Sequence, residues 1–314
     1  MDKLRVLFMG TPDFAVPSLK LLNSKYDVVG VICQPDKING RGKKVSFGPV
    51  KEFAIENNLD VYQPETFKDN ACLDLLNDLN PELIVVAAYG KILPEYVLDY
   101  AKFGCINVHG SLLPKYRGAS PIQAAVLNGD DKTGITIMHM AKGLDTGDII
   151  LTKETDIGFY ETAGDLFDRL SDLGAKCLDD AIVQLVNNTA KRTPQDESKS
   201  SYVSMIKKEM GLLDFSLSAL QLKNKVYGLN PWPCAYVEAK SGNLKIHKII
   251  VTDEVYDAKP ATIIGVCKEG IKVVCGDNKV IIITEIQKQG KKKMDAYSFS
   301  LGHTILEGSQ IYSL

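Results

Sequence analysis

The sequence lacks the features that mark several common classes of protein. Its formal net charge is only −2 over 314 residues, so no overall positive field indicates a nucleic-acid-binding protein. Its apolar runs, such as Leu83 to Tyr89, are far shorter than the roughly 20 residues that a membrane-spanning helix needs, and the N-terminus has no signal-peptide pattern. None of the seven cysteines forms a Cys-x-x-Cys pair, which argues against a zinc or redox site. We therefore expect a cytoplasmic protein with reduced thiols, no metal and no membrane partner.

Sequence motifs of several enzyme classes are also missing. The Gly-Lys steps at residues 42, 90 and 290 lack the glycine five residues earlier that a phosphate-binding P-loop requires. There is neither a Gly-x-Ser-x-Gly elbow nor a His-Glu-x-x-His helix motif. The sequence thus gives no sign of a P-loop NTPase, an α/β-hydrolase or a zinc protease.

The length and an ordinary composition, with 45% hydrophobic and 24% charged residues, favour a globular protein of two domains. In the first part, apolar strands alternate with helical patterns, which is typical of an α/β domain with a doubly wound, mostly parallel sheet. Residues 187–201 are polar and have no hydrophobic period, whereas five short β-rich segments with Gly-rich turns follow, as in a small barrel or sandwich. We predict a first domain at 1–188, a linker at 189–206 and a β domain at 207–314.

Two polar side chains are expected at the end of one buried strand. In open α/β sheets, ligands bind beyond the carboxyl ends of the strands, and side-chain alternation puts Asn107 and His109 on the same side there. An amide and an imidazole held together can both donate hydrogen bonds to one carbonyl oxygen on which charge develops. Alternatively, His109 caps a neighbouring helix and Asn107 satisfies backbone groups.

A loop between two later strands carries Gly143-Leu144-Asp145-Thr146-Gly147-Asp148 and could bring Asp145 to His109. A carboxylate beside an imidazole fixes the tautomer of the ring, favours its charged form and accepts a proton. Asp-Thr-Gly is also a common turn sequence. A turn without any catalytic role is therefore the other interpretation.

In its motifs, the chain resembles the folate-dependent formyltransferase family. The order and spacing of these motifs are specific to that family, and they cover nearly the whole chain. They are Met9-Gly10-Thr11-Pro12-Asp13-Phe14-Ala15-Val16-Pro17, Asn107-x-His109, Ser111-Leu112-Leu113-Pro114, Tyr116-Arg117-Gly118, Pro121-Ile122-Gln123, Gly143 to Asp148, Asn230-Pro231-Trp232-Pro233, and Gln287 with Gly290-Lys291-Lys292-x-Met294.

The resemblance implies a Rossmann-like first domain that binds 10-formyltetrahydrofolate and an OB-like second domain that helps to hold tRNA. Asn107 and His109 would stabilise the oxyanion of a tetrahedral intermediate as a methionyl amine attacks the formyl carbon. Asp145 would pair with His109 and help to move the proton. Direct transfer of this kind needs neither a metal nor a covalent intermediate. The folate pocket would include Ser111, Leu112, Leu113 and Pro114, with Tyr89 and Gly90 nearby.

A basic loop of about fifteen residues separates the second expected strand from the next helical pattern. Arg41, Lys43 and Lys44 lie in it among glycines, so these cations could follow a phosphate backbone. A solvated lysine loop is the alternative. The resemblance implies that the loop enters the acceptor-stem end of initiator methionyl-tRNA, with Arg41 at the unpaired first position.

Two other functions remain open at this point. One is a formyltransferase acting on an amino sugar or another small amine, and the other is a tRNA-binding protein without catalysis. The basic loop and the C-terminal part, with 15 Lys against 11 acidic residues from residue 207 onward, argue against a small acceptor. The presence of Asn107, His109 and Asp145 together argues against a loss of catalysis. Tyr116 and Ala124 depart from the family pattern, in which tryptophan and arginine are common, and a monomer is expected.

Overall fold

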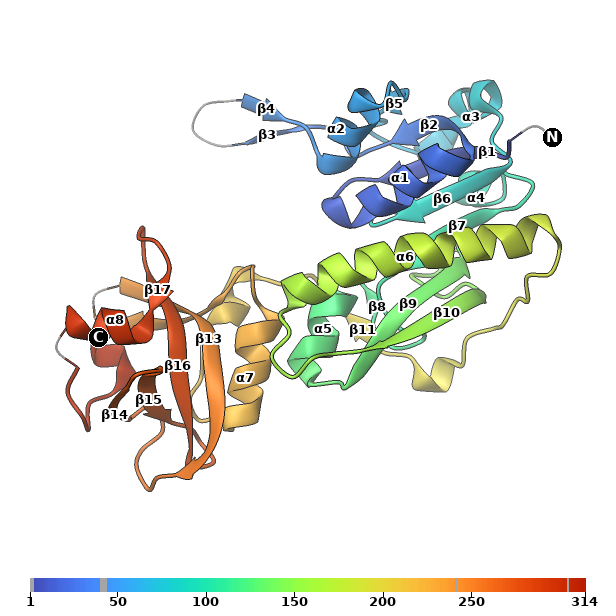
Figure 1. Cartoon of the computed structure of the whole chain (residues 1–314). Helices are drawn as coiled ribbons and strands as arrows, with labels where there is room; N and C mark the ends of the chain where they lie inside the picture. Colours follow the sequence, from blue (N-terminus) through green and yellow to red (C-terminus); the bar gives the residue numbers. More distant parts are fainter. Residues whose placement is uncertain (1–2, 40–43, 241, 304) are drawn as a thin grey trace. The chain divides into compact units, whose positions relative to one another are not determined.

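The computed structural model describes residues 3–39, 44–240, 242–303 and 305–314 (Figure 1). Contacts between Cα atoms divide the chain into two compact units. Unit 1 comprises Met1–Pro121, Lys132–Asp156 and Phe167–Ser204, and unit 2 comprises Ile122–Asp131, Ile157–Leu166 and Met205–Leu314. Unit 2 therefore also includes two short segments that precede its main part in the sequence, at 122–131 and 157–166.

Unit 1 is built on a seven-stranded sheet with the order β10-β9-β7-β6-β1-β2-β5. The five strands from β5 to β7 are parallel, whereas β9 runs antiparallel to both β7 and β10. The prediction of an α/β fold with a mostly parallel sheet is thus confirmed. The strands are β1 Arg5–Gly10, β2 Asp27–Ile32, β5 Val61–Tyr62, β6 Leu83–Ala87, β7 Cys105–His109, β9 Lys132–His139 and β10 Ile149–Asp156.

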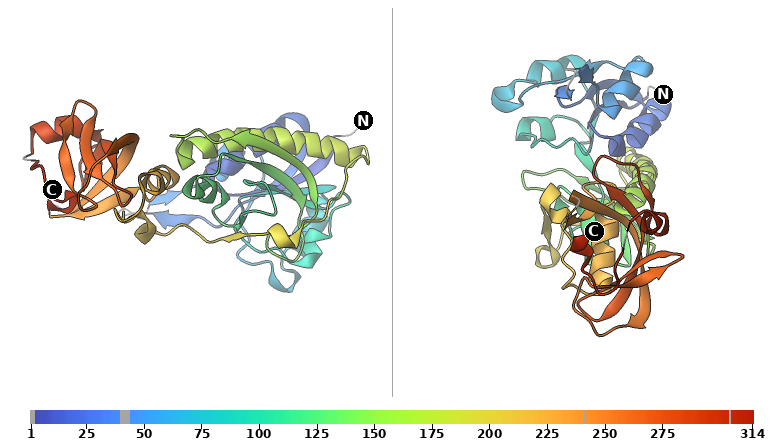
Figure 2. Two further views of the ribbon diagram at one scale, coloured as in Figure 1. Left: turned by 90° about the horizontal axis from the view of Figure 1, so that it is seen from below. Right: turned by 90° about the vertical axis from the view of Figure 1, so that its left-hand side faces the viewer.

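Helices lie on both faces of this sheet (Figures 1 and 2). Along β1, Leu7 and Met9 belong to one buried cluster with residues of α3 and α4, because alternate side chains of a strand point to the same face. On the opposite face, a Cβ added to Gly174 of α6 would lie 2.9 Å from Val108, so α6 packs closely on β7. The helices of unit 1 are α1 Val16–Lys25, α2 Pro49–Glu56, α3 Leu73–Leu79, α4 Glu95–Leu98 and α6 Ala163–Val186, of which α6 begins in unit 2.

Unit 2 contains an antiparallel sheet with the order β12-β13-β16-β15-β14. Helix α7 begins at a capping box in which Ser218 and Gln221 exchange hydrogen bonds. The predicted strand-rich C-terminal part is confirmed, although β13 and β16, with 14 and 10 residues, are longer than the short strands expected. The elements are α5 Pro121–Asn128, α7 Ala219–Gly228, β12 Ala235–Ala239, β13 Gly242–Val255, β14 Ile263–Cys267, β15 Gly270–Val274, β16 Lys279–Lys288, β17 Met294–Asp295 and α8 Ala296–Leu301.

Two short pairs of strands lie outside the main sheets. The segment expected as a basic loop contains an antiparallel pair, β3 and β4, and a second pair, β8 and β11, is parallel. Among the described residues, no helix is both long and apolar enough to cross a membrane. The remaining elements are β3 Lys37–Asn39, β4 Lys44–Ser46, β8 Arg117–Gly118, β11 Tyr202–Val203 and the 3₁₀ turns η1 Asp13–Ala15, η2 Lys68–Asn70, η3 Glu197–Lys199, η4 Lys208–Gly211 and η5 Ile311–Ser313.

Candidate active site

Asn107 and His109 stand at the carboxyl end of β7, where the sequence placed them. They share one face of the strand with Cys105, which belongs to the buried cluster beneath α3 and α4. In the ladder with β9, Asn107 lies opposite Met138 and His109 lies opposite Thr136. Their exposed fractions are 8% and 6%. Both polar groups are thus held by rigid strands and largely shielded from water, which strengthens any electrostatic interaction that they make.

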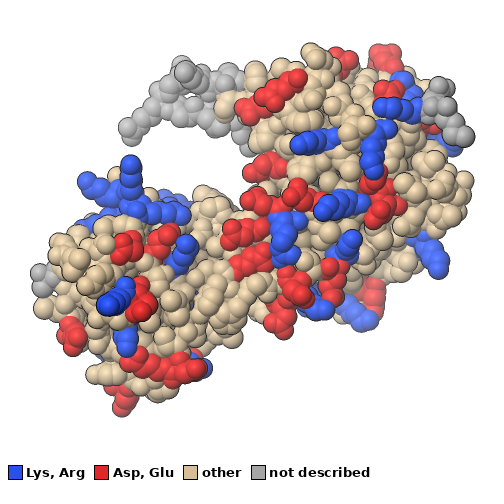
Figure 3. Space-filling model, viewed as in Figure 1, with Lys and Arg blue, Asp and Glu red and all other residues tan. Residues whose placement is uncertain are grey.

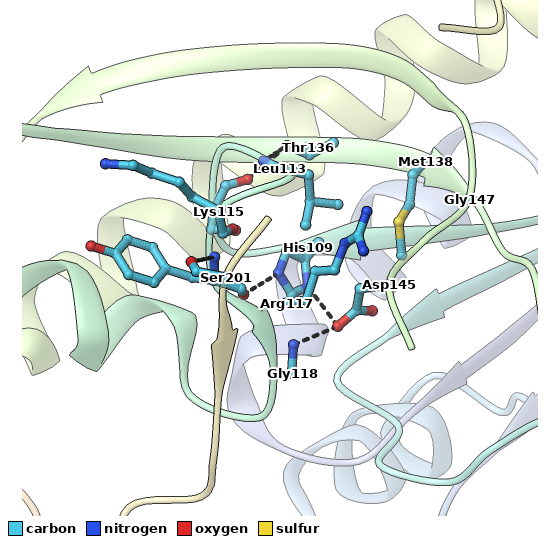
Figure 4. A network of polar contacts seen from close by, with 12 residues as sticks. His109, Leu113, Lys115, Arg117, Gly118, Thr136, Met138, Asp145, Gly147 and Ser201 are labelled. Atoms are coloured by element: carbon cyan, nitrogen blue, oxygen red, sulfur yellow. Dashed lines mark hydrogen bonds and ion pairs between the residues drawn. The ribbon is translucent and has the colours of Figure 1, made fainter. Parts of the chain in front are cut away.

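The imidazole of His109 lies between a carbonyl group and a carboxylate (Figure 4). Its Nε2 is 3.0 Å from the carbonyl oxygen of Tyr116. Because a carbonyl oxygen only accepts hydrogen bonds, Nε2 carries a proton. The other nitrogen, Nδ1, is 3.8 Å from Oδ2 of Asp145. Nδ1 is therefore the atom through which His109 can exchange a proton with Asp145, after an approach of about 1 Å.

Asp145 reaches this position because its turn is seated on the end of β9. The residue has a left-handed backbone, with φ of 53°, and its Oδ2 accepts a hydrogen bond of 2.8 Å from the backbone N–H of Gly118. A Cβ at Gly147 would lie only 1.7 Å from the carbonyl oxygen of His139. Only glycine fits at Gly147, and this close approach brings the carboxylate to the imidazole.

The loop after β7, expected to form part of a folate pocket, is braced by β9. Thr136 donates its hydroxyl hydrogen to the carbonyl of Ser111 at 2.7 Å and accepts from the N–H of Leu113 at 3.1 Å. Ser111 is fully buried and donates its own hydroxyl to the carbonyl of Lys115. The Ser111 side chain thus shapes the loop, whereas Leu112 and Pro114 are partly exposed.

Tyr89 and Gly90 follow β6, the strand beside β7. The Tyr89 ring is 1% exposed and packs edge-on against Phe67 in the core. Its hydroxyl has no hydrogen-bond partner among the described residues. Burial raises the pKa of this phenol. Gly90 is exposed, with φ of 74°. The surface at this point is therefore provided by Gly90 and the backbone, and the Tyr89 side chain faces inward.

Of the basic residues expected to contact tRNA, Arg41 and Lys43 lie outside the described residues. Lys44 begins β4. At the base of this hairpin, Lys51 donates to Asp36 at 2.5 Å and to Gln63 at 2.7 Å. The hydrogen bond from Lys51 lowers the pKa of Asp36, and one from Gln63 adds to the effect. This cluster connects the hairpin to α2.

Sequence reasoning gave no role to Arg117 or Gln195. The Arg117 side chain is fully buried and donates to Gln195, Glu197 and Tyr202. The hydrogen bonds to Glu197 raise the pKa of the Arg117 guanidinium above its usual value. Gln195 contacts the turn that carries Asp145. A signal was available, because a buried guanidinium needs a carboxylate partner, and Glu197 lies in the polar segment after α6.

The site offers hydrogen-bond donors and one carboxylate to a ligand. Within the described ranges, no group of three or more His, Cys, Asp or Glu side chains is arranged to hold a metal ion. Buried donors at a strand end, beside a carboxylate that can accept a proton, suit a reaction in which charge develops on an oxygen and an amine loses a proton.

Two family profiles match this chain: one described as formyl transferase at residues 3–182, and one described as formyl transferase, C-terminal domain, at residues 205–304. The methionyl-tRNA formyltransferase of Clostridioides difficile (strain 630) is 46% identical over 306 residues, which are 97% of this chain and 99% of that protein. That of Clostridium novyi (strain NT) is 46% identical over 303 residues, which are 96% and 98% of the two chains.

Solved structures share the fold. WlaRD, a sugar 3N-formyl transferase solved in the presence of dTDP and 5-N-formyl-THF, superposes with a TM-score of 0.68 at 21% identity, over 93% of this chain and 100% of that one. HypX from Aquifex aeolicus in complex with tetrahydrofolic acid gives a TM-score of 0.62 at 16% identity, over 95% and 47% of the two chains.

Proposed function

Because this chain belongs to the formyl transferase family and matches methionyl-tRNA formyltransferases over nearly its full length, we propose that it formylates the amino group of methionyl initiator tRNA. The formyl donor is 10-formyltetrahydrofolate. The reaction is a direct aminolysis that supplies formylated initiator for translation, and the enzyme acts as a monomer in the cytoplasm.

Asn107 and His109 stabilise the oxyanion that forms when the amine attacks the formyl carbon. Since Nε2 of His109 already donates to the Tyr116 carbonyl, the Asn107 amide supplies the direct hydrogen bond to the oxyanion, and His109 acts from the neighbouring position on the same face of β7. The burial of both side chains increases the strength of these interactions.

Asp145 takes part in the movement of the proton. As the new carbon–nitrogen bond forms, the attacking amine loses a proton, and the folate nitrogen gains one when its bond to the formyl carbon breaks. Asp145, which lies beside Nδ1 of His109, accepts the proton of the amine and gives it to the folate nitrogen as the bond from that nitrogen to the formyl carbon breaks. No covalent bond to the protein is required.

Binding of the two substrates is assigned to separate surfaces of the chain. The folate contacts the loop Ser111–Pro114 and the backbone at Tyr89–Gly90, whereas the tRNA contacts Arg41, Lys43 and Lys44. Exposed lysines at 291–293, between β16 and β17, add positive charge on unit 2, and Figure 3 shows Lys and Arg side chains gathered on one part of that unit. Such contacts bind phosphates without reading sequence.

The observation that carries this proposal at the site is the 3.8 Å approach of Asp145 to His109, next to Asn107 at the end of β7. The test is transfer of a labelled formyl group from 10-formyltetrahydrofolate to charged initiator tRNA, charged elongator tRNA and small amines. The expected order is initiator first and small amines last. Faster reaction with a free amino sugar would overturn the assignment of the acceptor.

The other two functions are not favoured. Relatives that are 42–46% identical over nearly the whole chain carry the methionyl-tRNA formyltransferase name, which speaks against an amino-sugar or small-amine acceptor. A tRNA-binding protein without catalysis would not need a buried carboxylate–imidazole pair beside an amide.

A further inference from the structure

The chain returns to the active site after α6, in a segment that we call the strap (residues 193–203). At its start, Thr193 and Ile149 exchange two backbone hydrogen bonds of 2.9 and 3.0 Å. At its end, the strap pairs in parallel with β8, where the N–H of Arg117 donates to the carbonyl of Ser201 at 2.8 Å. A Cβ at Gly118 would lie 2.3 Å from the carbonyl oxygen of Val203. Both ends of the strap are therefore fixed within unit 1.

Between these anchors, Gln195 holds the turn that carries Asp145. Its side-chain Nε2 donates to the backbone carbonyls of Asp145 and Gly147, each at 2.8 Å. Its Oε1 accepts from Nε and Nη2 of Arg117 at 3.1 and 2.8 Å. Because arginine can only donate, the oxygen of this amide must face Arg117, and the NH₂ group must face the turn. The hydrogens of the NH₂ group therefore bond to the turn that carries Asp145.

The position of the Arg117 side chain is itself fixed by hydrogen bonds. Its guanidinium is fully buried and forms a double hydrogen bond with the carboxylate of Glu197, at 2.8 and 2.7 Å. The hydroxyl of Tyr202 accepts a further bond from Nη1. A bidentate pair of this kind fixes the plane of the guanidinium. Because Oε1 of Gln195 accepts hydrogen bonds from this guanidinium, its position is fixed as well.

The strap also supports the other neighbour of His109. The N–H of Tyr116 donates to the hydroxyl of Ser201 at 2.9 Å, and the carbonyl of Tyr116 accepts from Nε2 of His109. Figure 4 shows Ser201 on one side of His109 and Asp145 on the other. One segment, far from β7 in the sequence, therefore braces both partners of the imidazole.

We infer that Gln195 is a positioning residue that sets the distance between Asp145 and His109. The inference rests on the proposed function, since it assigns a role in that reaction. Asp145 has a left-handed backbone, and Gln195 is bonded to its carbonyl and to that of Gly147. Without these two bonds, the turn loses a restraint that keeps the carboxylate within about 1 Å of hydrogen-bond contact with Nδ1.

The test compares Gln195→Met with the wild-type chain in the formyl-transfer assay. Methionine keeps the length of the side chain but removes both donors and the acceptor, while Arg117 retains Glu197 and Tyr202. We expect kcat to fall by about 10- to 100-fold, with the KM values for folate and tRNA changed less than about twofold.

Two further variants make the result decisive. Gln195→Glu keeps an oxygen that accepts from Arg117, but it replaces the NH₂ donor group by a second oxygen that faces the carbonyls of Asp145 and Gly147. This variant should therefore be at least as slow as Gln195→Met. Ser198→Ala is the matched control, because Ser198 bonds only to Asp196 within the strap, and it should keep full activity.

The outcomes separate this inference from the function on which it rests. If the wild-type chain transfers no formyl group, the proposed function fails. If it does, and a folded Gln195→Met or Gln195→Glu protein keeps the wild-type kcat, the inference is wrong. An equal loss in Ser198→Ala would also overturn it, because the strap would then act as a whole and not through Gln195.

Discussion

Acidification should destabilise the protein through His139, the last residue of β9. The side chain is 7% exposed, and its Nε2 has no hydrogen-bond partner in the part of the chain that the structure describes. Burial lowers the pKa of this imidazole to about 4, and the positive charge of Arg192 acts in the same direction, against a smaller opposing effect of Asp148. His139 is thus neutral in the folded protein at pH values where an unfolded histidine is already charged.

The sign and size of the effect follow from proton linkage. The pKa of His139 rises from about 4 in the folded chain to 6.5, the ordinary value for histidine, in the unfolded chain, so unfolding takes up a proton between these pH values. The free energy of unfolding therefore falls as the pH drops below 6.5. The loss is about 2 kcal/mol at pH 5 and approaches about 3 kcal/mol below pH 4. Burial also lowers the pKa of His247, which adds a loss of the same sign.

The assay is urea unfolding of the full chain at a series of pH values from 7.5 to 5, for the wild type and His139→Gln. Glutamine does not titrate, so the variant should lose about 2 kcal/mol less than the wild type over this range, whatever its stability at pH 7.5. His303 is exposed, and His303→Gln should retain the wild-type slope. Parallel curves for the wild type and His139→Gln would refute the argument.

Three other variants test the site. His109→Ala should reduce kcat by more than about a hundredfold with little change in tRNA affinity, and near-normal turnover would remove His109 from the reaction. Replacing Arg41, Lys43 and Lys44 together by alanine should raise the KM for tRNA and make it less dependent on salt while folate binding stays intact, whereas an equal loss of folate affinity would show a structural role for the loop. Gly118→Ala should lower kcat and the thermal midpoint, because its Cβ would lie 2.3 Å from the carbonyl of Val203, and a wild-type melting curve would contradict this contact.

The strands of the unit 1 sheet could be predicted well, because the hydrophobic pattern that marks each strand lies within a short stretch of the sequence. Apolar runs such as Leu83–Ala87 and the alternation around Asn107 depend only on neighbouring residues, and the structure contains both strands. The start of α5 at Pro121 was expected from Ser120-Pro121. The folding of the basic segment into β3 and β4 was not expected, because glycines and lysines carry little strand signal.

The site could be predicted only in part, because its geometry depends on contacts between distant segments. The Asp-Thr-Gly sequence indicates a turn, yet nothing local says that Gly147 lies against the carbonyl of His139 and so brings Asp145 to His109. Tyr89 is a similar case. The family resemblance implied a place near the folate pocket, but the direction of its ring depends on the apolar residues around Phe67.

The strap shows why a polar segment without hydrophobic period was easily taken for a simple connection. Hydrophobic periodicity detects elements that bury apolar faces, whereas residues 193–203 are held by polar contacts to a buried guanidinium and to backbone carbonyls. Leaving the charge of Arg117 buried and unpaired would cost several kcal/mol, so the folded chain must bring an acceptor to it. Glu197 and Gln195 provide those acceptors, and the bonds of Gln195 to the Asp145 turn connect the neutralisation of this buried charge to the geometry of the active site.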